Sequence, residues 1–258
     1  MIGRAFGKNV SENPNLSLED WHQRFRQQAE WTRELRHHLF AKFNLSTSAA
    51  ILEVGCGSGA VLGESAKLDY PSTFGLDINS RVLFFCQEKY PQVHLSAGDA
   101  DWLPFADGNF DLTYCHYLFL WLKHPLQALQ EMKRVTRPGG WVATFAEPDY
   151  EGYISYPTPL AELTSLQAKS LKKQGVNTHM GRQLKQLFHQ AGFRDVDCGL
   201  IAAQWKDNAE QLEYELQMMR CDLNAIGKDN LFIKYEKKIG NRDEAIYFIP
   251  TFYATGRA

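Results

Sequence analysis

Leu52-Glu53-Val54-Gly55-Cys56-Gly57-Ser58-Gly59 is the stretch that decides the fold, because an apolar strand runs directly into a loop with glycine at every second position. Glycine permits positive φ angles and lets a ligand approach the backbone with no side chain in the way. A predicted helix from about residue 60 would point its free N–H groups at a molecule above the loop. The spacing also satisfies the dinucleotide fingerprint G-x-G-x-x-G/A, because Ala60 follows, so the loop alone does not identify its ligand.

Short apolar strands and helical stretches alternate around this loop. Strands are predicted over residues 51–54, 73–76, 93–96, 110–115 and 141–146. Helices are predicted over residues 60–68, 80–90 and 125–135, and an earlier one, capped by Asp20, over 20–43. Alternation at this spacing indicates βαβ units, right-handed crossovers and a parallel sheet. Such sheets bind ligands at the carboxyl ends of their strands, near the point where the strand order reverses.

The composition indicates an ordinary globular chain. It has 258 residues, 44% hydrophobic and 22% charged, with a net charge of −2, which argues against a polyphosphate partner and against nucleic acid held by bulk charge. Five scattered cysteines without a C-x-x-C pair predict neither a disulfide framework nor a metal site. The first residues lack the apolar core of a signal peptide, and the apolar run 117–122 is too short to span a membrane. We therefore expect a cytoplasmic protein.

Acidic residues follow the next two strands along the chain. Asp77 ends the second strand, where a carboxylate can accept both hydroxyl groups of a ribose. A plain helix-capping role for Asp77 before Asn79-Ser80 is the alternative. The third strand is followed by Gly98-Asp99-Ala100 and then by a Leu103-Pro104-Phe105 turn that leads into the next buried strand.

With these motifs in order, the chain resembles the class I S-adenosylmethionine-dependent methyltransferases, of the small-molecule kind with a methyltransferase-11/25-like core. The resemblance covers about residues 47–147. The matching motifs are Leu52-Glu53-Val54-Gly55-Cys56-Gly57-Ser58-Gly59, Gly75-Leu76-Asp77, Gly98-Asp99-Ala100, Leu103-Pro104-Phe105 with Phe110-Asp111, and Arg137-Pro138-Gly139-Gly140.

The resemblance implies a Rossmann-like α/β fold: a seven-stranded, mostly parallel sheet with helices on both faces, an antiparallel last strand and added helical cap elements. It implies S-adenosylmethionine as the cofactor and S-adenosylhomocysteine as its product. The glycines would pack beneath the methionine part, Glu53 would steady the loop, and Asp77 would hold the ribose. The residues expected around the cofactor are Glu53, Gly55, Cys56, Gly57, Gly59, Asp77, Ile78, Asp99, Ala100, the backbone carbonyl of His116 and, on a lid helix that also carries Arg24, Gln28 and Trp31.

Beyond residue 150 the chain departs from the common pattern of this family. Helices are predicted over 160–173, 182–191 and 209–238, and strands over 196–205 and 245–255. Within a single structural domain overall, we expect a lid at 1–44, the cofactor-binding core at 45–150, and the rest of the sheet with substrate-cap insertions at 151–258. The acceptor cannot be transferred from the family to this region.

Methyl transfer is an in-line displacement that needs positioning more than covalent help. His116, after the fourth strand, is the candidate general base, and a role in shaping the pocket is its alternative. Glu147 and Asp149 are rival bases. The residues expected to contact an O, N or C acceptor are Trp121, Glu147, Tyr150 and Tyr153, and other aromatic residues that could line the pocket are Phe119, Tyr156 and Trp205. An aromatic content of 13% suits an aromatic or lipophilic acceptor.

Other interpretations remain open for this sequence. They are an NAD-dependent oxidoreductase, a non-catalytic cofactor-binding domain and a protein methyltransferase. A nucleic-acid methyltransferase is disfavoured because the fourth strand ends in Tyr114-Cys115-His116-Tyr117 rather than an Asp/Asn-Pro-Pro-Tyr signature, and because no basic stripe is present. An exposed helical cap could pair two subunits as a homodimer.

Overall fold

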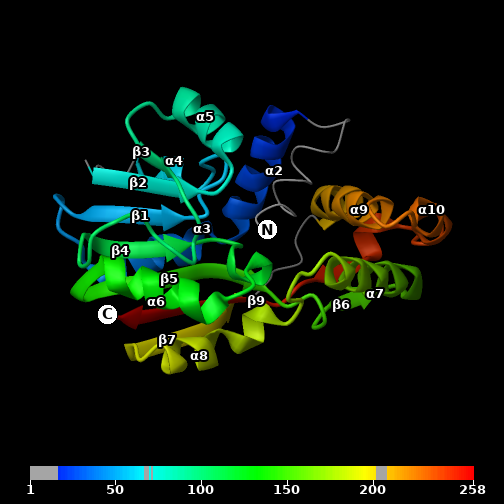
Figure 1. Cartoon of the computed structure of the whole chain (residues 1–258). Helices are drawn as coiled ribbons and strands as arrows, with labels where there is room; N and C mark the ends of the chain where they lie inside the picture. Colours follow the sequence, from blue (N-terminus) through cyan, green and yellow to red (C-terminus); the bar gives the residue numbers. More distant parts are fainter. Residues whose placement is uncertain (1–16, 67–69, 71, 202–207) are drawn as a thin grey trace.

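A computed structural model describes residues 17–66, 70, 72–201 and 208–258 of the chain. Its centre is a seven-stranded sheet (Figure 1) with the strand order β3-β2-β1-β4-β5-β9-β7. The strands are β1 (Ala50–Val54), β2 (Ser72–Asp77), β3 (His94–Ala97), β4 (Phe110–Cys115), β5 (Thr136–Pro148), β7 (Arg194–Ile201) and β9 (Thr251–Arg257).

The sheet is parallel from β3 to β5, and β9 runs antiparallel to both of its neighbours, β5 and β7. The predicted fold class, including the antiparallel last strand, is confirmed. The chain moves outward from β1 to β2 and β3 on one side, and returns to β4 and β5 on the other. The strand order therefore reverses beside β1, directly before the glycine loop.

Helices cover both faces of this sheet. They are α2 (Leu18–Trp31), α3 (Arg33–Phe43), α4 (Leu62–Ser65), α5 (Ser80–Lys89), α6 (Pro125–Val135) and α8 (Met180–Gln190), with a 3₁₀ turn η1 (Phe119–Trp121). On one face, Leu39 and Phe40 of α3 pack with Ile51 of β1, and on the other face α6 and α8 pack with the next strand residue, Leu52. The alternation follows from the two-residue period of a strand, which sends neighbouring side chains to opposite faces.

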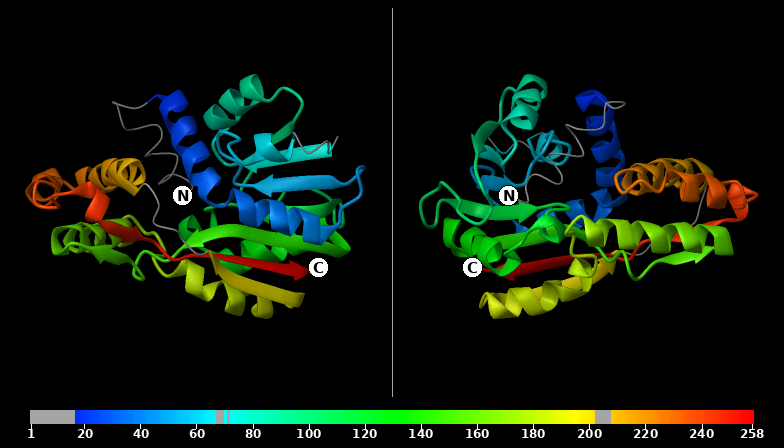
Figure 2. Two further views of the ribbon diagram at one scale, coloured as in Figure 1. Left: turned by 180° about the vertical axis from the view of Figure 1, so that it is seen from behind. Right: turned by 45° about the vertical axis from the view of Figure 1, so that its right-hand side comes forward.

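A smaller helical unit lies at the carboxyl ends of the parallel strands. It contains α7 (Thr158–Lys173), α9 (Asn208–Asn224), α10 (Asp229–Glu236), the turn η2 (Arg242–Glu244) and a two-stranded sheet of β6 (Ile154–Tyr156) and β8 (Ile246–Phe248). Figure 2 shows this unit beside the main sheet in both views. It has its own apolar cluster, which includes Leu160, Leu163, Leu212 and Leu216. We call it the cap.

Several predicted boundaries differ from the structure. The helix expected over 20–43 is interrupted at Thr32, whose hydroxyl donates to the Ala29 carbonyl at 3.1 Å, and its N-cap is Ser17 rather than Asp20. The stretch 209–238 forms two helices, α9 and α10, rather than one, and 245–255 forms the two strands β8 and β9.

The fifth strand is longer than predicted, because Thr136 already pairs with Phe110 of β4, and Gly139 and Gly140 form backbone hydrogen bonds with Ala258, directly after β9. Of the helix predicted over 60–68, residues 67–69 lie outside the described part, as do residues 202–205 of the strand predicted over 196–205. Within the described ranges, no helix is long and apolar enough to span a bilayer.

Candidate active site

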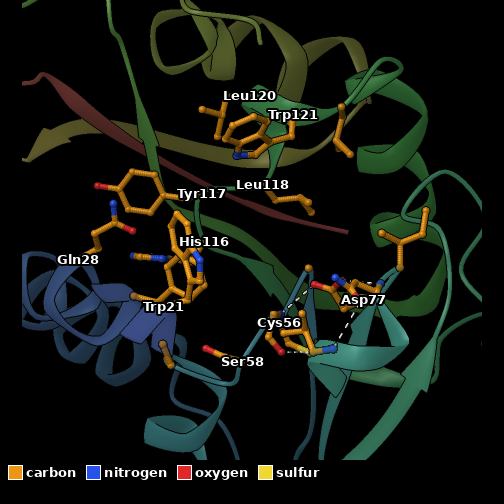
Figure 3. Close-up of a pocket in the computed structure, with 18 of the residues that line it drawn as sticks. Trp21, Gln28, Cys56, Ser58, Asp77, His116, Tyr117, Leu118, Leu120 and Trp121 are labelled. Atoms are coloured by element: carbon orange, nitrogen blue, oxygen red, sulfur yellow. Dashed lines mark hydrogen bonds between the residues drawn. The ribbon is translucent and has the colours of Figure 1, made fainter. Parts of the chain in front are cut away.

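A cavity of about 710 Å³ opens at the carboxyl ends of the parallel strands. Its floor comes from the loops after β1 and β2, one wall from α2, and its far end from α7 and α9 of the cap. Figure 3 shows Asp77 and Cys56 across this cavity from Gln28, His116 and Tyr117. Its volume lies within the range of roughly 300–1,000 Å³ that is usual for small-molecule sites.

The glycine loop forms the floor of the cavity. Gly55, Gly57 and Gly59 have φ angles of 74°, 51° and 80°, a region that other residues adopt only with strain. A Cβ atom at Gly57 would meet no heavy atom within 4 Å, whereas one at Gly55 would lie 2.8 Å from Leu118 Cδ1. The backbone at Gly57 is therefore open to a molecule in the cavity, whereas Gly55 is packed against Leu118.

Asp77 joins the loops after β1 and β2. Its Oδ2 accepts the Gly57 N–H at 2.9 Å and its Oδ1 accepts the Asn79 N–H at 2.9 Å. Burial raises the pKa of the Asp77 carboxyl above its usual value. Asp77 lines the cavity, and a carboxylate has about four acceptor positions, so these backbone contacts do not exhaust its capacity to accept donors from a molecule in the cavity. Ile78, 48% exposed, lies beside it in the cavity wall.

Glu53, near the end of β1, and Asp99 and Ala100, after β3, also line the cavity. Glu53 is buried and accepts the Tyr114 hydroxyl at 3.3 Å, and desolvation raises its pKa well above the usual value. Asp99 Oδ1 accepts the Asp101 N–H at 3.0 Å. Cys56 lines the cavity, and burial raises the pKa of its thiol. Gly59 packs instead against Cys86 and Tyr90.

His116 lies where β4 ends and forms a hydrogen bond through Nε2 with Thr32 Oγ1 at 2.9 Å. Burial and the nearby Arg36 guanidinium lower the pKa of His116 well below its usual value. Arg36 is itself buried and donates to Thr32 Oγ1, to the Ala29 carbonyl and to Glu64. The break between α2 and α3 therefore fixes a neutral imidazole at the cavity wall.

Tyr117, which sequence reasoning did not single out, follows His116 with a φ angle of 53°. Its N–H donates to the Ala146 carbonyl at 2.9 Å, which holds this unusual backbone in place. Non-glycine residues in this region are strained and are enriched at functional sites. Its side chain lines the cavity between the glycine loop and the cap.

Glu147, the predicted acceptor contact and rival base, is fully buried, and among the described residues it does not belong to the cavity lining. Its carboxylate accepts the N–H groups of Leu118 at 2.9 Å, Phe119 at 2.8 Å and Leu120 at 3.2 Å. Desolvation raises the pKa of Glu147 to about 8. Glu147 thus holds the segment 118–120, which lines the cavity through Leu118 and Leu120.

The predicted lid residues occupy different positions on α2. Gln28 lines the cavity, whereas the Trp31 ring lies against Tyr214 of the cap, with 6.1 Å between ring centroids. Arg24 Nη1 lies 2.9 Å from the sulfur of Met218. The helix therefore contacts both the cavity and α9.

The predicted aromatic residues are likewise divided between the cavity and other places. Trp121 and Tyr150 line the cavity, and Tyr153 stands behind Tyr150 at 5.9 Å between ring centroids. Phe119 is in the main core, Tyr156 is 61% exposed, and Trp205 lies outside the described residues. The other rival base, Asp149, is buried and paired with Arg182.

Two further acidic residues line the cap end of the cavity and were not predicted. Glu215 and Asp222 both lie on α9, and Gln167 of α7 lies next to Asp222. A signal was present in the sequence, because the two acids are seven residues apart and so share one helix face. Within the described ranges, no group of three or more His, Cys, Asp or Glu side chains could hold a metal ion.

Residues 52–144 match the family model for the methyltransferase domain. The chain is 30% identical over 185 residues to the demethylmenaquinone methyltransferase of Lactiplantibacillus plantarum, a match that covers 64% of this chain and 78% of that protein. The chain belongs to the class I S-adenosylmethionine-dependent methyltransferases.

Other members of this methyltransferase family match more partially. The malonyl-[acyl-carrier protein] O-methyltransferase of a Marinomonas species is 29% identical over 118 residues, which cover 44% of each protein. This chain spans only 42% to 53% of the length of three of the curated proteins that it matches. A solved methyltransferase of Thermotoga maritima, described as a possible histamine N-methyltransferase, has the same fold, with a TM-score of 0.60, 16% identity and coverage of 100% and 99% of the two chains.

Proposed function

We propose that this chain binds S-adenosylmethionine in the 710 Å³ cavity and transfers its methyl group to a small organic acceptor. The observation that carries the proposal is the continuity of the cavity. One space extends from the glycine loop and Asp77 to the aromatic and acidic side chains of the cap end. Donor and acceptor could therefore meet without leaving the protein.

The residues present fit the cofactor. The open backbone at Gly57 leaves room for the methionine part, and the Asp77 carboxylate, which lines the cavity, would accept the ribose hydroxyls. Ile78 would cover one face of the adenine, Asp99 would accept its amino group, and the Ala100 N–H would face a ring nitrogen. The His116 carbonyl would accept the cofactor ammonium. The whole set proposed to hold the cofactor is Glu53, Gly55, Cys56, Gly57, Gly59, Asp77, Ile78, Asp99, Ala100 and His116, with Gln28 from the lid.

When bound, the cofactor supplies a methyl group on a sulfonium, which an acceptor displaces in line. The protein's own residues contribute positioning and exclusion of water, and positioning alone is worth up to ~7–11 kcal/mol. His116 is neutral, because burial and Arg36 lower its pKa, so its ring is able to accept a proton. Since its Nε2 already forms a hydrogen bond with Thr32, we assign His116 first to shaping the wall.

The acceptor would lie at the cap end of the cavity, beside Trp121 and Tyr150. Relatives are named for a demethylated quinone and for malonyl-[acyl-carrier protein], which supports organic rather than nucleic-acid acceptors. Tyr153 and Glu147 would act from behind the lining, through Tyr150 and the segment 118–120. Residues 1–44 would act as a lid over the core at 45–150, and residues 151–258 would complete the sheet and supply the cap.

Isothermal titration calorimetry with S-adenosylhomocysteine tests the cofactor site. We expect binding by the wild type, a loss of about 10²- to 10⁴-fold in Asp77→Asn, and no change in Asp243→Asn. Asp243 is an exposed acid in η2 and serves as the matched control. The expected loss corresponds to two charge-assisted hydrogen bonds of ~1.5–3 kcal/mol each. Binding of NADH but not of S-adenosylhomocysteine would refute the proposal.

A further inference from the structure

The cap end of the cavity holds two carboxyl groups on one face of α9. Glu215 and Asp222 lie seven residues, about two helical turns, apart. Glu215 is only 6% exposed, and both residues line the cavity. Asp222 is half-buried, so neither acid is fully exposed to bulk water.

Within the described ranges, the hydrogen-bond partners of both carboxyl groups are neutral. The Tyr247 hydroxyl donates to Glu215 Oε2 at 2.9 Å, and Gln167 Nε2 donates to Asp222 Oδ2 at 2.7 Å. Among the residues that the structure describes, none donates a hydrogen bond to Glu215 Oε1 or Asp222 Oδ1, and no Lys, Arg or His forms an ion pair with either carboxyl group. Each group therefore has one oxygen available to a molecule in the cavity.

Neighbouring groups fix where these oxygens lie. The Tyr153 hydroxyl donates to Gln167 Oε1 at 2.6 Å, which orients the amide so that its nitrogen faces Asp222. Tyr247 in turn donates to Glu215 from β8. Gln167 of α7 and Tyr247 of β8, with Tyr153 just before β6, thus hold the two carboxyl groups in position before any ligand arrives. A binding site requires this kind of preorganisation.

Keeping these carboxyl groups away from water is costly unless a positive charge joins them. Desolvation raises the pKa of Glu215 to about 7, with a contribution from Asp222, and raises the pKa of Asp222 to about 7. A buried carboxylate gains most from a cationic hydrogen-bond donor. The aromatic residues Tyr117, Trp121 and Tyr150 line the same cavity, and aromatic rings also attract a cation.

We propose that the methyl acceptor is a small amine whose protonated nitrogen donates hydrogen bonds to Glu215 and Asp222. Before transfer at that nitrogen, one of these carboxylates would take a proton from the ammonium, and the freed lone pair would then bond to the methyl group as the carbon–sulfur bond breaks. The proposal rests on the methyltransferase function proposed above and assigns the acceptor's chemical class and the two residues that select it. Uncharged polar acceptors could use the same oxygens, but they would not neutralise the negative charge of the two carboxylates.

The test uses the full-length protein saturated with S-adenosylhomocysteine. Equilibrium dialysis would measure binding of a graded series of aryl-alkyl amines, from benzylamine to tyramine, each against the alcohol in which a hydroxyl replaces the amino group. We expect at least one amine to bind about 10-fold or more tightly than its alcohol. Glu215→Gln and Asp222→Asn should each weaken that amine by about 10- to 100-fold and leave the alcohol unchanged.

Glu162→Gln is the matched control, because Glu162 is an exposed acid on α7 outside the cavity lining of the described residues, and it should leave amine binding unchanged. S-adenosylhomocysteine affinity separates the two proposals. If the product does not bind, the cofactor site is wrong. If it binds and no amine is preferred over its alcohol, or if both variants bind the amine as well as the wild type does, the amine acceptor is wrong.

Discussion

Gly57→Ala tests the claim that the loop backbone is the cofactor's floor. The added methyl group would meet no protein atom within 4 Å and would project from a residue that lines the cavity. It would therefore occupy space that the methionine part of the cofactor needs. Gly139→Ala is a matched control, because Gly139 also has a positive φ angle, 79°, and open space around its Cβ position. Among the described residues, Gly139 does not line the cavity.

The two variants share the folding cost and differ in the binding cost. Alanine in the left-handed region costs about 1–2 kcal/mol, offset by about 0.4–1 kcal/mol through the unfolded chain. Both variants should thus lose about 1 kcal/mol of unfolding free energy, or roughly 2–4 °C in Tm. Crowding of a methyl group against the cofactor costs about 1–3 kcal/mol, which corresponds to a loss of about 5- to 150-fold in affinity.

Calorimetric titration of S-adenosylhomocysteine and differential scanning calorimetry measure the two costs separately. We expect weakened binding only in Gly57→Ala and a similar fall in Tm in both variants. If Gly57→Ala binds the product as tightly as Gly139→Ala does, the cofactor does not lie over Gly57, and the assigned floor is refuted.

Two buried groups give further predictions. Glu147→Gln should lose about 1–3 kcal/mol of unfolding free energy, because an amide nitrogen cannot accept a backbone N–H. Burial raises the pKa of Glu147 from 4.5 to about 8, so the stability that this group adds is complete below pH 4.5 and is lost as the pH rises through 8. In urea unfolding, the difference in unfolding free energy between the wild type and Glu147→Gln should therefore shrink between these two pH values. A difference that grows over this range would contradict the prediction. For His116, with its lowered pKa, an NMR titration of the ring should show no midpoint near 6.5, and one found there would refute the neutral imidazole. His116→Ala should leave product affinity within about threefold if the ring only shapes the wall, while a far larger loss in turnover would restore the general base.

The fold was predictable where local pattern and local structure agree. The strand before Gly55 and the acid that ends β2 were visible because both are contiguous in the sequence. The break at Thr32 was not, because the apolar spacing continues across it, and the Thr32 hydroxyl there contacts His116, 84 residues away in the sequence. The early start of β5 was hidden for the same reason, since Gly139 and Gly140 bond to the Ala258 backbone at the other end of the chain.

In the candidate site, the residues at the cofactor end were predictable from the sequence, and the acidic residues at the cap end were not. At the glycine-loop end of the cavity, Asp77 is the last residue of β2 and Asp99 comes just after β3. Both belong to motifs with a characteristic spacing, so the sequence predicted that they lie together. Glu215 and Asp222 interrupt a helical stripe of buried residues, but the sequence does not show which partner helix that stripe meets. Their environment depends on Gln167 and Tyr247, which come from distant segments of the cap. An acidic residue on a helix indicates a ligand site only when the structure shows which side chains contact its carboxyl group, and the sequence does not show these contacts.

One buried carboxyl group connects the two ends of the cavity. Glu147 accepts the N–H groups of residues 118–120. Within this short segment, Leu118 packs against Gly55 of the glycine loop. The next residue after the segment is Trp121, which lines the acceptor end of the cavity. A shift of this segment would therefore move the cofactor floor and the acceptor wall together. In-line transfer depends on the relative position of donor and acceptor, so the site needs these two surfaces in a fixed register. Glu147 is thus a positioning residue, and its burial away from the cavity is a condition for that role because no ligand then competes for its oxygens.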